Sequence, residues 1–193
     1  MTKWLSHRMV ERGIIKEEEQ ELYQFGIRNG MILLLNVVTA LVIGLLTEQL
    51  AVVAVFTLSF MVLRSYTGGY HSDSRIFCYL GSNLVLLVPV YTQAVFYKTS
   101  LAWLLAVLLV SAGIIFLLSP MHSKNRKLDK EEQKHFGRKA RLIAALELAV
   151  LGILWHAGQI PYAYAVYTGI CITALFMIVG KAQLWMQSHT ENG

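Results

Sequence analysis

A short polar stretch of the sequence, residues 64–78, carries two side chains that could act together in catalysis. It reads RSYTGGYHSDSRIFC and lies between long apolar runs, with His71 and Cys78 separated by six residues. A cysteine thiolate is a strong nucleophile, and a neighbouring histidine can take its proton and later return it to a leaving amine. The pair Gly68-Gly69 gives the backbone the freedom to bring the imidazole back to the sulfur. The stretch therefore raises the hypothesis of a cysteine nucleophile paired with a histidine.

The position of Cys78 at the expected start of an apolar helix supports this hypothesis without deciding it. Free N–H groups and the positive end of the helix dipole favour a thiolate there, and Arg64 and Arg75 add positive potential. A lone cysteine in a membrane protein is more often a small apolar filler, which is our interpretation of Cys171, and a loop histidine is usually only solvated. From the spacing alone, both interpretations of His71 and Cys78 stay open.

The composition of the 193 residues is that of a polytopic membrane protein. The chain is 55% hydrophobic and 15% charged, has a mean hydropathy of +0.51, and gathers its apolar residues in long runs. A soluble domain has about 25% charged residues. We expect no cleavable signal peptide, because the first 29 residues are charged and lack a short apolar core. The two cysteines lie far apart without metal-type spacing, so we expect no disulfide framework and no metal site.

Six apolar runs predict membrane-spanning helices. The second run has only 14 residues, or about 21 Å of helix, which is less than the roughly 30 Å of a hydrocarbon core. A re-entrant pair over residues 30–63 is therefore the alternative to two full spans. The predicted spans are residues 30–46, 50–63, 79–97, 101–118, 142–157 and 162–180.

The distribution of Lys and Arg predicts how these spans are oriented. Five lie in the N-terminal segment 1–29, two in the loop 64–78 and eight in the basic loop 119–141, whereas the turns expected on the opposite side contain only Lys98. The positive-inside rule then places both termini and both loops in the cytoplasm. We predict an all-α integral membrane protein of the cell membrane, with residues 1–193 forming a single polytopic bundle of about six transmembrane helices.

Three charged features have further interpretations. The N-terminal stretch MTKWLSHRMVERG is either an amphipathic helix in the membrane interface or a partly ordered tail. The loop 119–141 is sufficiently explained as a positive-inside anchor, with attraction of an acidic peptide or anionic lipid as an additional role. Glu147 is expected to face the bundle interior or a polar cavity. No nucleic-acid motif accompanies the net charge of +5, so we expect no nucleic-acid partner.

The stretch Arg64-Ser-Tyr-Thr-Gly-Gly-Tyr-His71, followed after six residues by Cys78, resembles the signature of the accessory gene regulator B family. The chain length, the charged N-terminal segment, the multi-span layout and the basic loop resemble that family as well. Its members are integral-membrane cysteine endopeptidases that process quorum-sensing propeptides. The resemblance implies that Cys78 and His71 are catalytic and that Arg64, Thr67 and Gly69 are supporting or substrate-binding positions. Plain interfacial snorkelling is the alternative for Arg64.

The resemblance also implies the reaction and the partners. Cys78 would attack the junction between the signal portion and the C-terminal tail of an autoinducer propeptide, and His71 would protonate the departing amine. An internal cysteine or serine of the substrate would then capture the acyl-enzyme thioester as a cyclic thiolactone or lactone. The resemblance implies no cofactor and no metal, and it is compatible with a homodimer in the lipid bilayer. The alternatives are a small membrane transporter or exporter of a peptide, although no internal repeat is visible, and a scaffold that docks a sensor protein.

Overall fold

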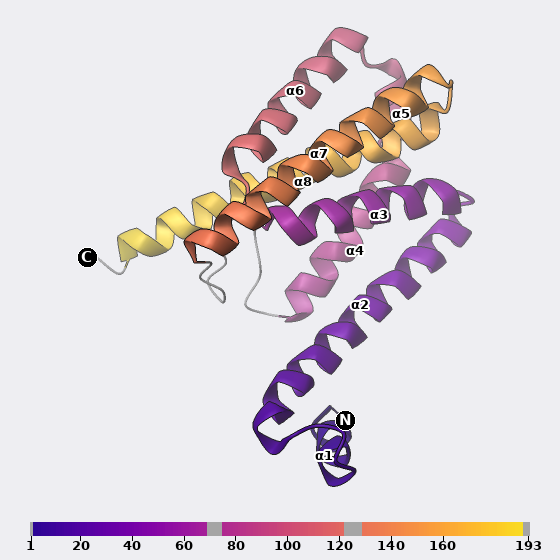
Figure 1. Ribbon diagram of the computed structural model, residues 1–193. Coiled ribbons are helices and arrows are strands. Elements are labelled where there is room, and N and C mark those ends of the chain that lie inside the picture. Colours follow the sequence, from indigo (N-terminus) through magenta and orange to yellow (C-terminus); the bar gives the residue numbers. More distant parts are fainter. Residues whose placement is uncertain (1, 69–74, 122–128, 191–193) are drawn as a thin grey trace. The chain divides into compact units, whose positions relative to one another are not determined.

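The computed structural model describes residues 2–68, 75–121 and 129–190, and within these ranges all regular structure is helical (Figure 1). The chain forms two compact units, Met1–Thr39 and Ala40–Gly193. An all-helical chain with long apolar helices confirms the predicted fold class, a polytopic helical membrane bundle.

The first unit consists of an N-terminal helix and the first part of a long second helix. Helix α1 covers Thr2–Glu11, a 3₁₀ turn follows at Glu17–Glu19, and α2 covers Gln20–Leu46. Ser6 is buried, donates to the Lys3 carbonyl over 3.1 Å, and accepts a hydrogen bond from Gln20 Nε2 over 3.4 Å. The Arg8 guanidinium lies 4.8 Å from the centre of the Trp4 ring. The segment is thus helical over Thr2–Glu11, and its place in the membrane interface stays a prediction.

The second unit is a bundle in which three helices pack on a central fourth. Helix α8 contacts α3, α6 and α7 (Figure 1). Its middle section is almost completely buried. One core cluster gathers Phe56, Phe96 and Tyr164, and a second gathers Leu63 and Ile115 with residues of α7 and α8. The elements of this unit after α2 are α3 (Leu50–Thr67), α4 (Arg75–Tyr91), α5 (Gln93–Lys98), α6 (Leu101–Leu118), α7 (Lys130–His156) and α8 (Ile160–Thr190).

Four segments in the described part of the chain are long and apolar enough to cross a membrane. They are Glu17–Leu46, Leu50–Thr67, Leu101–Leu118 and Ile160–Met186, and Tyr79–Tyr91 is a shorter apolar helix. The predicted span 142–157 lies within α7. Apart from Thr92 and Ala157, the residues of the six predicted spans are helical. The number of spans and their sidedness stay predictions.

Several helix ends differ from the predicted ends. Helix α3 continues four residues beyond residue 63, to Thr67, and so has 18 residues, or about 27 Å, close to the thickness of a hydrocarbon core. The predicted span 79–97 is divided, because α4 ends at Tyr91 and α5 begins at Gln93. Between them the Thr92 hydroxyl donates to the Val88 carbonyl over 2.8 Å. Pro89, which has no N–H to donate, lies in the last turn of α4.

The basic loop is shorter than predicted because α7 begins early. Asp129 is the N-cap residue, and its carboxylate accepts a hydrogen bond from the Glu132 N–H over 2.7 Å. The Glu132 side chain in turn accepts from the Asp129 N–H, which completes a capping box. Residues 130–141 of the predicted loop 119–141 are consequently helical.

Candidate active site

The structure places Cys78 at the beginning of α4. This helix starts at Arg75, so Cys78 is its fourth residue and belongs to its first turn, as predicted. The first turn of a helix carries the positive end of the helix dipole, which favours a negatively charged sulfur. The Cys78 side chain, together with His71 and Gly69, lies outside the described part of the chain.

The end of α3 determines where the chain leaves the bundle toward His71. Gly68 closes the helix with φ of +73°, and its N–H donates to the Arg64 carbonyl over 3.2 Å. A Cβ at this position would lie 2.7 Å from the Met121 carbonyl oxygen. Both the left-handed backbone and the lack of space require glycine here. Gly68 thus uses the conformational freedom of glycine, while the expected return of His71 to Cys78 stays a prediction.

Thr67 joins the end of α3 to the segment that follows α6. Its side chain is fully buried, and its carbonyl accepts a hydrogen bond from the Met121 N–H over 2.9 Å. A main-chain hydrogen bond between residues so far apart in sequence fixes the two segments to each other. Through these contacts Thr67 holds the end of α3 in place. A supporting role of Thr67 in the active site stays a prediction.

Arg64 lies one turn before Thr67 and points into the helix bundle. Its guanidinium carbon is 4.7 Å from the centre of the Phe176 ring on α8 and 5.8 Å from that of Phe60 on α3. Stacking of a guanidinium on aromatic rings is a stabilising cation–π contact. This contact links α3 to α8, so simple snorkelling toward solvent does not describe the Arg64 side chain.

The first turns of α7 pack against the same end of α3. The rings of Tyr66 and Phe136 are 6.5 Å apart, and Lys139 Nζ lies 5.9 Å from the Tyr66 ring centre. A Cβ on Gly137 would lie 2.9 Å from the Pro120 ring. The end of α3, residues 119–121 and the start of α7 therefore form a junction from which the segment with His71 departs.

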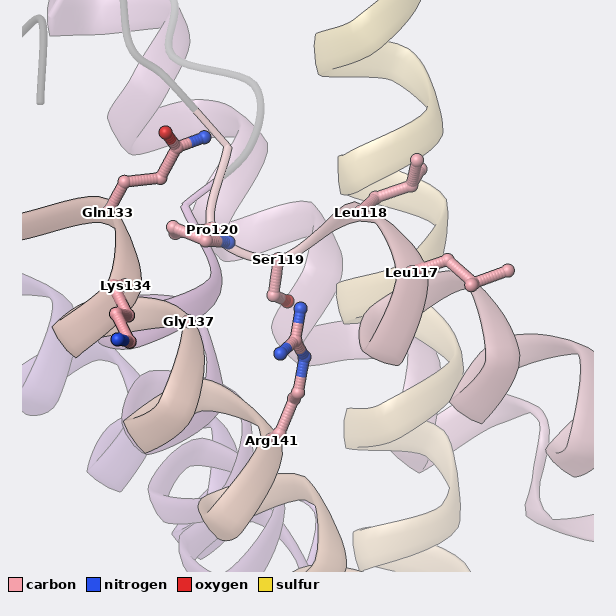
Figure 2. Close-up of a pocket in the computed structure, with 8 residues that line it drawn as sticks. All are labelled: Leu117, Leu118, Ser119, Pro120, Gln133, Lys134, Gly137 and Arg141. Carbon is pink, nitrogen blue, oxygen red and sulfur yellow. The ribbon is translucent and has the colours of Figure 1, made fainter. Parts of the chain in front are cut away.

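A pocket of ≈ 450 Å³ opens beside this junction, between the end of α6 and the beginning of α7 (Figure 2). Ser119, Gln133, Lys134 and Arg141 contribute its polar lining. The Arg141 guanidinium donates through Nε to the Phe116 carbonyl over 3.2 Å. The sequence gives no local sign of this pocket, because the two sides of its lining, residues 117–120 and 133–141, are separated by residues 121–132 of the chain.

Glu147 faces the interior of the second unit, as expected of an acidic residue in an apolar helix. Its carboxylate accepts a hydrogen bond from the Ser59 hydroxyl of α3, the partner that the sequence alone did not identify. Gly169 of α8 leaves room for this pair, since a Cβ there would lie 2.5 Å from Ser59 Oγ. The hydrogen bond between Ser59 and Glu147 joins α3 to α7, and α8 packs closely against Ser59 at Gly169.

Cys171 occupies a different environment from Cys78. It is half-buried in the middle of α8, with Ser111 and Tyr167 as its polar neighbours. This agrees with its interpretation as a packing residue. Within the described residues, no cluster of His, Cys, Asp and Glu side chains has the arrangement of a metal site.

The sequence matches proteins of one family over most of its length. The accessory gene regulator B family matches residues 1–179. An AgrB-like protein of Clostridium perfringens (strain SM101, type A) is 23% identical over 148 residues, which cover 74% of this chain and 69% of the relative. A second AgrB-like protein, from strain 13 of that species, is 24% identical over 131 residues, or 65% of this chain and 61% of the relative.

A third relative comes from another genus. The accessory gene regulator protein B of Staphylococcus intermedius is 25% identical over 156 residues, which cover 79% of this chain and 80% of the relative. No solved structure matches the chain. The matched range includes all of α1 to α7 and the polar stretch with His71 and Cys78. The chain therefore belongs to the accessory gene regulator B family, which is consistent with a part in quorum-sensing propeptide processing.

Proposed function

We propose that the protein is a membrane cysteine endopeptidase that removes the C-terminal tail of an autoinducer propeptide and cyclises the remaining signal peptide. Family membership over residues 1–179 is the observation that carries this proposal. The start of α4 three residues before Cys78 supports it, because a helix N-terminus stabilises the thiolate that the chemistry needs. The catalytic pair is Cys78 as nucleophile and His71 as base and acid.

The first half of the reaction is acyl transfer to the enzyme. His71 takes the thiol proton, and the Cys78 sulfur attacks the carbonyl carbon of the peptide bond that joins the signal portion to the tail. A carbon–sulfur bond forms as the carbon–nitrogen bond breaks, and the imidazolium of His71 gives its proton to the departing amine. The tail leaves with a new amino terminus, and the signal portion stays on Cys78 as a thioester.

The second half transfers the acyl group to the substrate itself. The thiol or hydroxyl of a cysteine or serine within the signal portion loses its proton to His71 and attacks the thioester carbonyl. Cys78 leaves as a thiolate, and a cyclic thiolactone or lactone is released. Exchange of one thioester for another is nearly balanced in free energy, so exclusion of water by the membrane and the bundle favours cyclisation over hydrolysis.

The proposed orientation places this chemistry on the cytoplasmic side of the cell membrane. The support is the excess of Lys and Arg in the segments 1–29, 64–78 and 119–141. These segments would share one side together with both termini. A propeptide made in the cytoplasm would then reach the active site without crossing the bilayer first.

The two cysteines provide a matched test. The protein is produced in membranes together with its propeptide, and tail release is followed by mass spectrometry. Cys78→Ala should abolish release with normal insertion, whereas Cys171→Ala should retain it, because Cys171 is packed in the middle of α8. Equal loss from both substitutions, or tail release by Cys78→Ala, would refute Cys78 as the nucleophile. Either result would favour a transporter or a scaffold instead.

The role of His71 is tested by the reactivity of Cys78 without substrate. In a Cys171→Ala background, the rate at which iodoacetamide alkylates Cys78 near neutral pH reports how much thiolate is present. His71→Ala should lower this rate about tenfold, which corresponds to about 1.4 kcal/mol of lost thiolate stabilisation, and should stop cleavage. An unchanged alkylation rate together with retained cleavage would show that His71 is not the partner.

A further inference from the structure

The pocket between α6 and α7 is lined by a buried hydroxyl group, that of Ser119. Ser119 is only 4% exposed, and its Oγ has no hydrogen-bond partner in the described part of the chain. A buried polar group without a partner is costly, so it is rare unless a ligand or water completes it. Because Ser119 lines the pocket, a bound group there could accept its hydrogen bond.

A guanidinium group shares the space with this hydroxyl. Figure 2 shows the Ser119 hydroxyl and the Arg141 guanidinium pointing toward one another in the lining of the pocket. The hydrogen bond from Arg141 Nε to the Phe116 carbonyl holds the planar group in place and leaves its terminal nitrogens toward the pocket. A planar guanidinium held in this way matches the geometry of a phosphate or carboxylate.

The remaining lining of the pocket is also suited to an anion. Lys134 lies seven residues before Arg141 on the same face of α7, with Gly137 between them. No carboxylate is among the side chains that the structure places in the lining. The volume of ≈ 450 Å³ is within the range of about 300–1,000 Å³ that is usual for ligand sites.

The position of the pocket favours a lipid as the source of the anion. Leu117, which also lines the pocket, is 83% exposed, and only 11% of α6 is buried inside the molecule. Trp103 and Val110, at seven-residue intervals before Leu117, are exposed as well. An apolar helix face of this kind meets acyl chains in a membrane, and it leads directly to the cationic pocket. Basic pockets between membrane helices are known to receive lipid headgroups.

We propose that this pocket binds the phosphate of an anionic phospholipid, whose acyl chains lie along the exposed face of α6. The Ser119 hydroxyl and the terminal nitrogens of Arg141 donate hydrogen bonds to the phosphate oxygens, and Lys134 adds positive charge. The site is independent of the proposed cleavage reaction, since it uses neither His71 nor Cys78. The pocket adjoins the junction at the end of α3. A lipid bound in the pocket would therefore stabilise this junction, from which the segment with His71 departs.

The test measures lipid binding to the purified full-length protein in an uncharged detergent. Phosphatidylglycerol is added in steps, bound lipid is counted by native mass spectrometry, and the unfolding temperature is recorded. Arg141→Gln should weaken binding about tenfold, the size expected for a charged hydrogen bond, and Lys134→Gln about fivefold. Arg138→Gln is the matched control, because Arg138 is exposed on the same helix and does not line the pocket. It should change binding less than about twofold.

Ser119→Ala keeps the test decisive even if a charged variant folds poorly. Removing a buried hydroxyl without a partner should leave the lipid-free protein as stable as before or slightly more stable. The same change should weaken phosphatidylglycerol binding about fivefold, as expected for one lost hydrogen bond, and reduce the rise in unfolding temperature that the lipid produces. A Ser119→Ala protein that binds phosphatidylglycerol like the wild type would overturn the proposal.

Three competitors distinguish the lipid from other anions. Phosphatidylcholine should bind more weakly, since its headgroup carries a cation that Lys134 and Arg141 repel. Inorganic phosphate and a hexaglutamate peptide should displace phosphatidylglycerol only poorly, because neither uses the exposed face of α6. If either of these soluble anions protects the protein as well as the lipid does, the pocket serves a free phosphate or an acidic peptide instead. If Arg138→Gln weakens binding as much as Arg141→Gln, general surface charge explains the effect and there is no specific site.

Discussion

The contact between Ser59, Glu147 and Gly169 leads to a quantitative prediction about Gly169→Ala. The new methyl carbon would lie 2.5 Å from Ser59 Oγ and 3.2 Å from Ser59 Cβ. Ser59 of α3 is buried against α8. Its hydroxyl can avoid the new methyl group only by rotating away from Glu147, which breaks their hydrogen bond. Gly169→Ala should therefore both overpack the α3–α8 contact and break the hydrogen bond to the carboxyl group of α7.

The expected magnitudes follow from these two effects. Overpacking a tight contact costs about 1–3 kcal/mol, and a hydrogen bond between membrane helices is worth about 0.6 kcal/mol on average and about 1.7 at most. Gly169→Ala should then destabilise the protein by about 2–4 kcal/mol, and Ser59→Ala by about 1 kcal/mol. After Ser59→Ala the hydroxyl is gone, and the methyl group of Gly169→Ala meets nothing closer than the Cβ at 3.2 Å. The double variant should be about 1–2 kcal/mol more stable than the sum of the two single changes predicts.

The assay is a double-mutant cycle on the purified protein in mixed micelles. Unfolding is driven by an increasing fraction of sodium dodecyl sulfate and followed by tryptophan fluorescence. Gly113→Ala is the control, because a Cβ at Gly113 would have no heavy atom within 4 Å in the described part of the chain. It should leave stability unchanged or raise it slightly. Effects of Gly169→Ala and Ser59→Ala that add within about 0.5 kcal/mol would refute the coupling, as would a neutral Gly169→Ala.

Two further predictions concern the active-site frame and the topology. Gly68→Ala should lower stability by about 1 kcal/mol or more and impair tail release, because φ is +73° and the Cβ would lie 2.7 Å from the Met121 carbonyl oxygen. Gly81→Ala, which has open space around the new Cβ, should change neither property in the same denaturation and cleavage assays. Single cysteines at Gln159 and Glu48 should react with a membrane-impermeant maleimide only from outside the cell. If the cysteine at Glu48 reacted from the cytoplasm instead, residues 30–63 would form a re-entrant pair.

Hydropathy predicts the helices of this chain well and their ends less well, for identifiable reasons. The apolar run of α3 stops at residue 63, but the helix continues because Arg64 stacks on Phe176 and Thr67 is buried against the segment after α6. These are tertiary contacts that no local pattern reveals. The early start of α7 has a local signal, since Asp129 followed three residues later by Glu132 is a capping-box pattern.

The candidate site shows the same division between local and long-range information. The position of Cys78 at a helix start could be predicted, because a polar stretch ends there and an apolar one begins. That Glu147 would face the interior could also be predicted from the cost of a carboxyl group in lipid. Its partner Ser59 is 88 residues away in sequence, and the pocket joins Ser119 to Arg141 across the basic loop. Which side chains meet depends on how α3, α6, α7 and α8 pack, and this packing is not encoded in any one segment.

The packing around the end of α3 separates the residues that hold the active-site segment from those that would perform the chemistry. Thr67 and Gly68 are tied to Met121 by a main-chain hydrogen bond and a close contact, and Met121 follows the segment that packs on α7. Changes at this frame should lower stability and cleavage together, because they displace the point from which the chain departs toward His71. A change at Cys78 should lower cleavage alone, because α4 needs no nucleophile in order to fold. Comparing the loss of stability with the loss of cleavage, residue by residue, would therefore distinguish a positioning role from a chemical one in this stretch.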